Sequence, residues 1–199
     1  MKIYLIRHGE STSDVKMKYD GDYDDNLTSK GIKEASVIAK KLSNSNIEII
    51  FTSPKIRARQ TTEILKSNLH CKIKVVNDLS EQDIYGAYPD LSRNQPEEEY
   101  RRLGEILADR NQTIEGVETY LHFKKRVIKS FSELTHQDFK VIAIVTHGGP
   151  IRTIFREILT LGELKKIGSG SIILLEKNKS NLQVVKMGGV TLVSPPPVF

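Results

Sequence analysis

The chain has 199 residues, 38% hydrophobic and 28% charged, which is typical of a single compact domain with a sizeable core. Its single cysteine, Cys71, excludes an intramolecular disulfide framework and predicts a reducing, cytoplasmic location. The net charge of +5 is spread along the chain and no long apolar run interrupts it, so neither nucleic acid nor a membrane is expected as a partner.

The first expected strand and helix lie near the N-terminus. Residues 3–6, Ile-Tyr-Leu-Ile, are β-branched, aromatic or aliphatic and predict a short buried strand. Residues 27–42 carry apolar side chains at helical spacing and predict an amphipathic helix. Its expected buried stripe consists of Ile32, Ala35, Ile38, Ala39 and Leu42.

A second strand and helix come next. Residues 47–51 predict a strand, and Ser53 and Pro54 predict the N-cap and the first position of a helix over residues 54–69. A further strand is expected at residues 72–76. The buried side of the helix is expected to consist of Ala58, Thr61, Ile64 and Leu65.

The pattern changes between about residues 82 and 138, where charged helices are expected at residues 96–110 and 116–134. We interpret this region as a helical insert over one edge of the sheet. The continuous apolar run at residues 141–146 then predicts a central parallel strand, and residues 148–159 predict a helix.

The last part of the chain predicts a hairpin over residues 171–187 that turns at residues 178–181, and residues 194–199 predict an extended tail because prolines cannot pair in a sheet. Alternating strands and helices predict an α/β fold of three α/β/α layers around a largely parallel sheet. We therefore expect one domain over residues 1–193.

Histidine or arginine follows three of the predicted strands. Arg7 and His8 come after the first strand, Arg57 lies in the helix after the second, and His147 follows residues 141–146. Because the carboxyl ends of parallel strands meet at one edge of a sheet, we expect these side chains to converge. Guanidinium groups and helix N-termini match phosphate oxygens, so the arrangement predicts a phosphate site. The structural alternative for His8 is a histidine that only caps a strand.

The same stretches resemble the histidine phosphatase superfamily, the phosphoglycerate-mutase-like family. The matching stretches, in chain order, are RHGEST at residues 7–12, LTSKG at 27–31, SPKIRARQT at 53–61 and HGG at 147–149. Each stretch alone is a weak signal, but four in family order are a strong one. The resemblance implies the phosphoglycerate-mutase-like fold and a phosphatase rather than a mutase.

The resemblance also implies roles for individual residues. His8 would be the nucleophile that accepts the phosphoryl group, while Arg7, Arg57 and a protonated His147 would hold its oxygens. No metal or cofactor is required, and the histidines and the cysteine show no close ligand spacing. The implied substrate-binding residues are Arg7, Ser11, Asp14, Arg57 and Gly148.

Two positions depart from the family pattern. The leaving-group proton would come from Glu81 after Leu79, with Asp83 as the reserve candidate, because Gly86 lies one residue further on than the family's glycine. Asp14 stands where the family usually has asparagine, and a carboxylate repels phosphate unless it is protonated, paired or turned away.

Other charged residues have open interpretations. Arg59 is expected to be a surface residue. Three arginines of the insert either bind a second anionic group of the substrate or form a solvated face; they are Arg93, Arg101 and Arg102. Glu118 and Thr119 either touch substrate or cap the following helix.

Three functions are compatible with these residues. The favoured one is a metal-independent phosphomonoester hydrolase that works through a phosphohistidine on His8. The alternatives are a cofactor-dependent phosphoglycerate-type mutase and a catalytically weak member that binds phosphorylated ligands. The segment after Glu81 lacks the mutases' Tyr-Gly-x-Leu-Gln pattern, which favours hydrolysis. A small phosphorylated molecule is the expected substrate, a phosphoprotein is the alternative, and nothing in the sequence predicts an oligomeric state.

Overall fold

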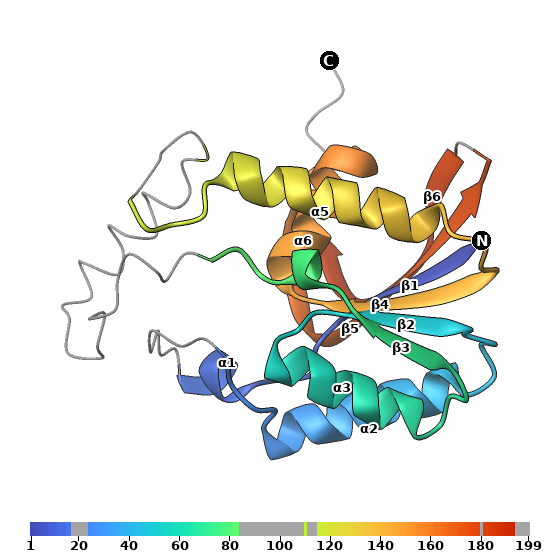
Figure 1. Cartoon of the computed structure of the whole chain (residues 1–199). Helices are drawn as coiled ribbons and strands as arrows, with labels where there is room; N and C mark the ends of the chain where they lie inside the picture. Colours follow the sequence, from blue (N-terminus) through green and yellow to red (C-terminus); the bar gives the residue numbers. More distant parts are fainter. Residues whose placement is uncertain (17–23, 84–109, 111–114, 180, 194–199) are drawn as a thin grey trace.

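The computed structural model describes residues 1–16, 24–83, 110, 115–179 and 181–193. Six strands form one sheet in the order β3-β2-β4-β1-β5-β6 (Figure 1). The strands are β1 Lys2–Arg7, β2 Ile49–Thr52, β3 Lys72–Val75, β4 Val141–Thr146, β5 Leu164–Asn178 and β6 Asn181–Leu192.

The sheet has a parallel half and an antiparallel half. β4 pairs in parallel with both β1 and β2, and β2 also pairs in parallel with β3. β5 runs antiparallel to both β1 and β6. The largely parallel sheet is therefore confirmed, and the hairpin turns between Asn178 and Asn181 as predicted. Its strands are longer than expected, because pairing continues back to Leu164 and on to Leu192 across a glycine-rich irregularity between Ile167 and Ile172.

Helices cover both faces of this sheet. α2 and α3 lie on one face, and α5 and α6 lie on the other (Figure 1), which gives the expected three layers. The helices are α1 Thr12–Lys16, α2 Ser29–Leu42, α3 Ile56–Lys66, α5 Tyr120–Thr135 and α6 Gly148–Thr153, with the 3-10 helix η1 Asn77–Leu79 and the π-helix η2 Ile154–Ile158.

α2 begins where the sequence pattern starts. Thr28 is the N-cap, and its side chain accepts a hydrogen bond from the N–H of Gly31. The predicted stripe is buried except for Ile32, which is 49% exposed, so that prediction is wrong. Gly31 faces the interior instead, because a Cβ there would overlap the backbone of Glu10. Ile32 is thereby left at the margin of the stripe.

α3 begins later than predicted. Its N-cap is Lys55 rather than Ser53, and its first residue is Ile56 rather than Pro54. The Ser53 hydroxyl is used elsewhere, since it lies 2.7 Å from Nε2 of His147. Three residues of the predicted stripe are buried, namely Ala58, Thr61 and Leu65, whereas Ile64 is half-buried.

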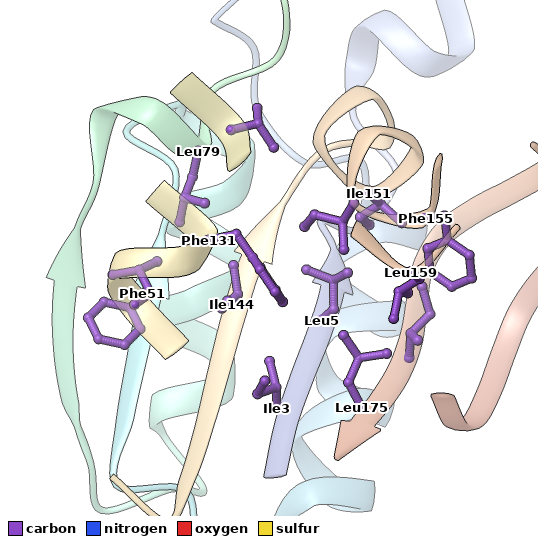
Figure 2. Close-up of a cluster of buried hydrophobic side chains, with 14 of the residues drawn as sticks. Ile3, Leu5, Phe51, Leu79, Phe131, Ile144, Ile151, Phe155, Leu159 and Leu175 are labelled. Carbon is purple, nitrogen blue, oxygen red and sulfur yellow. The ribbon is translucent and has the colours of Figure 1, made fainter. Parts of the chain in front are cut away.

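The other face carries α5, which belongs to the region predicted as a helical insert. α5 lies across the sheet and buries Phe123, Val127 and Phe131. Figure 2 shows Phe131 next to Leu5 and Ile144, whose strands β1 and β4 form the centre of the sheet. The helix predicted after residue 148 changes to π-helical winding at Ile154. The predicted helix at residues 96–110, apart from residue 110, and the predicted tail lie outside the described residues.

Candidate active site

The predicted site residues leave the sheet at one edge. β1 and β4 end together, because Arg7 is paired with Thr146 in the parallel register. His8 and His147 follow directly, and their ring centroids are 5.0 Å apart. Both side chains are buried. Parallel pairing thus converts two distant sequence positions into neighbours, as expected for the carboxyl edge of such a sheet.

Hydrogen bonds to both ring nitrogens determine the tautomer of His8. Nδ1 lies 2.7 Å from the carbonyl oxygen of Gly9, which can only accept, so Nδ1 carries the proton. Nε2 then carries the lone pair and accepts a hydrogen bond from Nε of Arg57 at 3.2 Å. The ring is 3% exposed. The arrangement holds a neutral imidazole with its nucleophilic nitrogen beside a guanidinium.

The electrostatics of the site keep both histidines neutral. Burial, followed by the charges of Arg57 and Arg7, lowers the pKa of His8 to about 3. Burial and the nearby His8 and Arg57 hold the pKa of His147 well below its usual value. His147 is therefore neutral in the absence of a phosphoryl group, because water cannot solvate a cation there and two arginines repel it. The protonated His147 implied by the resemblance concerns the site with a phosphoryl group and stays a prediction.

We expect acidification to destabilise the ligand-free protein through His8. Its folded pKa of about 3 lies below the unfolded value of 6.5, so the unfolded chain binds the extra proton between these values. The stabilisation is complete above pH 6.5 and is lost as pH falls toward 3, with a slope of up to about 1.4 kcal/mol per pH unit. Urea unfolding in phosphate-free buffers at about pH 7 and about pH 5 measures this loss. An equal loss in the His8→Gln variant contradicts the prediction.

Two arginines surround the histidines. Arg57 is fully buried on α3 and also pairs with Asp25, at 3.1 Å from its Nη1. Arg7 donates from Nη1 to the carbonyl oxygen of Ile167 at 2.6 Å and from Nη2 to Asp14 at 2.7 Å. Each arginine therefore has an aspartate as its counterion.

Two buried polar atoms of the site have no hydrogen-bond partner among the residues that the structure describes. They are Nε of Arg7 and Nδ1 of His147. Burying an unpaired polar group costs about 1–3 kcal/mol, so such atoms are rare in folded proteins. Both belong to residues that flank His8, and both can interact with an oxygen-rich anion.

Asp14 is paired rather than free. Burial raises the pKa of this carboxyl, but the charge of Arg7 and the N–H of Ser11 outweigh burial and hold that pKa below its usual value. Its Oδ2 accepts from the N–H of Ser11 at 2.9 Å and from the Ser11 hydroxyl at 3.0 Å. The predicted substrate contact of Ser11 is thus occupied by Asp14 in the ligand-free protein.

Glu81 lies against the start of α6. Its Oε2 accepts from the N–H of Gly149 at 2.9 Å, and its Oε1 accepts from the N–H of Gln82 at 3.0 Å. A Cβ at Gly149 would overlap Glu81 Oε1, whereas one at Gly148 would lie 3.9 Å from Oε2. The carboxyl group is therefore adjacent to the turn that carries His147. The reserve candidate, Asp83, is exposed.

The structure also defines contacts that the sequence did not predict. Asp25 lies in a charged stretch without periodicity, and nothing in that stretch identifies it as the partner of Arg57. Ser53 is the partner of His147, although the sequence suggested a helix cap. Thr61 accepts from the N–H of Gly9 at 3.1 Å and so ties α3 to the turn after His8. Such contacts join segments that no local pattern connects.

The structure also locates several of the other residues that the sequence analysis discussed. Arg59 is exposed, as expected. Thr119 caps α5 through the N–H of His122, and Glu118 pairs with Arg126 at 2.7 Å. Cys71 is half-buried against the core beneath α2 and α3, and burial raises the pKa of its thiol. Arg93, Arg101 and Arg102, for which substrate binding and a solvated face were the two interpretations, lie outside the described residues, as does Gly86.

The described part of the chain offers neither a metal site of clustered ligands nor a membrane-spanning helix. Among residues 1–16, 24–83, 110, 115–179 and 181–193, no group of three or more His, Cys, Asp and Glu side chains could hold a metal ion. In the same ranges, no helix combines the length and apolar character needed to cross a membrane.

Comparison with known proteins supplies an independent view of this arrangement. The profile of the histidine phosphatase superfamily (branch 1) matches residues 3–188. The uncharacterized phosphatase PhoE of Bacillus subtilis is 27% identical over 157 residues, which cover 78% of this chain and 76% of PhoE. A 2,3-bisphosphoglycerate-dependent phosphoglycerate mutase of Arabidopsis thaliana is 43% identical over 83 residues, covering 40% of this chain and 25% of the mutase. The crystal structure of the alpha-ribazole phosphatase from Shigella flexneri superposes with a TM-score of 0.78 at 22% identity, covering 94% and 96% of the two chains.

Proposed function

The chain belongs to the histidine phosphatase superfamily, and from that premise we propose that it hydrolyses phosphomonoesters through a phosphohistidine on His8, without a metal ion. The observation that carries this proposal is the hydrogen bonding of the His8 ring. Nδ1 donates to the Gly9 carbonyl, which leaves the lone pair on Nε2, where it accepts a hydrogen bond from the Arg57 guanidinium. A nucleophile held neutral at all physiological pH values needs no activating base.

The first step transfers the phosphoryl group to the enzyme. The Nε2 lone pair of His8 attacks phosphorus, a P–N bond forms, and the P–O bond to the alcohol breaks. The leaving oxygen takes the proton of the Glu81 carboxyl group, which lies beside the α6 turn. The Arg57 guanidinium, which donates to the attacking nitrogen, donates to a phosphoryl oxygen instead once the substrate is bound; their contact supports this role.

The second step regenerates the histidine. Water attacks the phosphorus of phosphorylated His8 and gives a proton to the Glu81 carboxylate. The P–N bond breaks, the lone pair returns to Nε2, and inorganic phosphate leaves. During both steps charge is spread over three phosphoryl oxygens, which fixed donors stabilise. Nε of Arg7 and Nδ1 of His147 are the buried donor sites without a partner that support this role, and the phosphoryl charge favours a protonated His147.

The substrate we propose is a small phosphorylated molecule. The names of similar proteins support this class, since they include an alpha-ribazole phosphatase and a phosphoglycerate mutase. The similarity to a mutase makes a phosphoglycerate mutase the second candidate function. A mutase shares the first step, transfer of the phosphoryl group to His8, but then passes that group to an alcohol and not to water. An assay with phosphoglycerate and a bisphosphoglycerate primer separates the two. Mutase turnover faster than phosphate release would overturn the hydrolase proposal.

Trapping of the intermediate tests the central step directly. The protein is mixed with p-nitrophenyl phosphate, quenched in alkali and measured as an intact protein by mass spectrometry. We expect the mass of one added phosphoryl group, localised to His8 by peptide mapping and removed by acid, which cleaves phosphohistidine. A matched His8→Ala sample should carry no added group. Turnover with the phosphoryl group on another residue contradicts the proposal.

Replacing Asp14 with asparagine is expected to strengthen binding of inorganic phosphate. The Asp14 carboxylate occupies Nη2 of Arg7 and interacts electrostatically with His8, so it competes with and repels a bound anion. Removing that one charge from a partly exposed position should lower the inhibition constant for phosphate by roughly tenfold. Inhibition of p-nitrophenyl phosphate hydrolysis measures it. Asp138→Asn, at the opposite end of β4, is the control and should leave the constant unchanged. Weaker inhibition in Asp14→Asn contradicts the prediction.

A further inference from the structure

The segment that carries Glu81 is held by an unusual set of hydrogen bonds to its backbone. Arg126 on α5 donates from Nη1 to the carbonyl oxygens of Asp78, at 2.8 Å, and Ser80, at 3.0 Å. Its Nη2 donates to the carbonyl oxygen of Glu81 itself, at 3.0 Å. The Thr146 hydroxyl, at the end of β4, donates to the carbonyl oxygen of Leu79 at 2.6 Å. Four successive carbonyl groups, at residues 78–81, are therefore each bonded to a side chain.

The Arg126 side chain is itself fixed. Its Nε and Nη2 donate to the two carboxylate oxygens of Glu118, at 2.7 and 2.8 Å. Together with the three carbonyl contacts, these bonds use all five N–H donors of the guanidinium. The two charged side chains are only 14% and 11% exposed. Burial raises the pKa of Glu118, but the hydrogen bonds from Arg126 and His122 and the charge of Arg126 together outweigh burial and hold that pKa below its usual value, so the pair is ionised.

A second set of contacts connects Arg126 to the other side of Glu81. The guanidinium lies over the ring of Phe123, 4.9 Å from its centroid. That ring borders Gly149, since a Cβ on Gly149 would lie 3.1 Å from its outer carbon. Gly149 in turn donates its N–H to the Glu81 carboxylate. Arg126 thus reaches Glu81 both through the backbone and through the Phe123 ring against the α6 turn.

Glu118 also forms hydrogen bonds with the two residues that follow Glu81. The N–H of Glu118 donates to the carbonyl oxygen of Asp83 at 2.8 Å, and Asp83 returns its own N–H to the Glu118 carboxylate at 3.2 Å. Gln82 donates from its side chain to the carbonyl oxygen of Glu118 at 2.8 Å. Gln82 and Asp83, at the start of the insert, therefore meet Glu118, just before α5, next to the segment that carries Glu81.

We propose that Arg126, held by Glu118, is a positioning residue that fixes the Glu81 carboxyl group where it can protonate the leaving oxygen. This inference rests on the proposed role of Glu81 as the proton donor. A catalytic group must be held within about 0.5 Å of its productive position, and a planar guanidinium that bonds three carbonyls and one carboxylate supplies that restraint. A lysine ammonium, with three donors on a flexible stem, cannot reproduce it.

The test uses substrates that differ in their need for a proton. p-Nitrophenyl phosphate releases a stable anion without protonation, whereas phenyl phosphate has nearly the same shape and a much more basic leaving oxygen. kcat/KM is measured because it reports the phosphorylation step even when release of phosphate limits turnover. We expect Arg126→Gln to lower kcat/KM for phenyl phosphate by about 10- to 100-fold, and that for p-nitrophenyl phosphate by no more than a few-fold.

Four further variants make the result decisive. Glu81→Gln should show the same selective loss. Adding Arg126→Gln to Glu81→Gln should not change the ratio of kcat/KM for the two substrates further, since both residues act through the Glu81 carboxyl group. Arg126→Lys should give an intermediate, equally selective loss, and it serves as the test if Arg126→Gln does not fold by circular dichroism. Arg156→Gln is the matched control: Arg156 also pairs with a carboxylate, Glu163, and lies over the Tyr120 ring. For Arg156→Gln the ratio of kcat/KM for the two substrates should equal that of the wild type.

The failures of the two proposals differ. If Glu81→Gln lowers kcat/KM selectively for phenyl phosphate but the Arg126 variants lower kcat/KM equally for both substrates, Arg126 has only a structural role. The inference is then overturned, while the role of Glu81 stands. If Glu81→Gln itself is not selective, Glu81 is not the proton donor and both statements fail.

Discussion

Replacing His8 with alanine is expected to reduce phosphatase activity by at least about 10⁴-fold, because covalent catalysis loses its nucleophile. The neutral Nε2 of His8 carries the lone pair and accepts a hydrogen bond from Arg57. Hydrolysis of p-nitrophenyl phosphate with excess chelator, from mildly acidic to neutral pH, measures the loss. Arg59→Ala is a suitable control, because Arg59 is exposed on the same helix as Arg57.

Each outcome of this experiment leads to a different conclusion. Wild-type activity that survives the chelator and disappears in His8→Ala supports a metal-free phosphohistidine route and justifies a panel of substrates. Inactivity of both proteins directs attention to the mutase assay and to the ligand-binding alternative. Equal activity in both means that the RHGE stretch is not the catalytic centre.

Replacing Arg57 with alanine should lower kcat/KM by about 10³-fold, the effect expected when an arginine that stabilises phosphoryl transfer is removed. The guanidinium is fully buried, so its charge acts at low dielectric on the attacking nitrogen and on the oxygens next to it. Arg57→Lys should also lose most of the activity, because a point charge does not reproduce the planar fork.

The pH profile offers a second measurement for the same variant. The charge of Arg57 is, after burial, the next largest cause of the low pKa of His8, which is about 3. Without that charge the pKa rises toward its usual value, and the acid limb of kcat/KM moves to higher pH. Activity of Arg57→Ala within a few-fold of the wild type, with an unmoved acid limb, would show that Arg57 contributes little to the site.

The pairing of each site arginine with an aspartate has a physical consequence for the ligand-free protein. Arg7 with Asp14, and Arg57 with Asp25, place carboxylates where they balance two partly or fully buried cations. An incoming phosphate must therefore exchange with or lie beside these carboxylates, whose acceptor geometry resembles its own. The Asp14→Asn variant measures the strength of that competition.

Local patterns predicted the strands and the parallel sheet well. Runs such as residues 141–146 are apolar throughout because a strand covered on both faces has no polar side, and the run is correspondingly buried. The same patterns were wrong at element ends. Ser53 and Pro54 have the chemistry of a helix start, yet the helix begins at Ile56. The Ser53 hydroxyl contacts both the N–H of Lys55 and His147, which follows the neighbouring strand β4.

The meeting of Arg7, His8, Arg57 and His147 could be predicted from the sequence, because strands that pair in parallel have their carboxyl ends at one edge of the sheet. How these groups are charged and held could not be predicted in the same way. The low pKa values of the two histidines come from burial, which no local pattern encodes. The contacts of Asp25 and Arg126 join segments far apart in the chain, and such contacts exist only once the sheet and its two helical layers have packed.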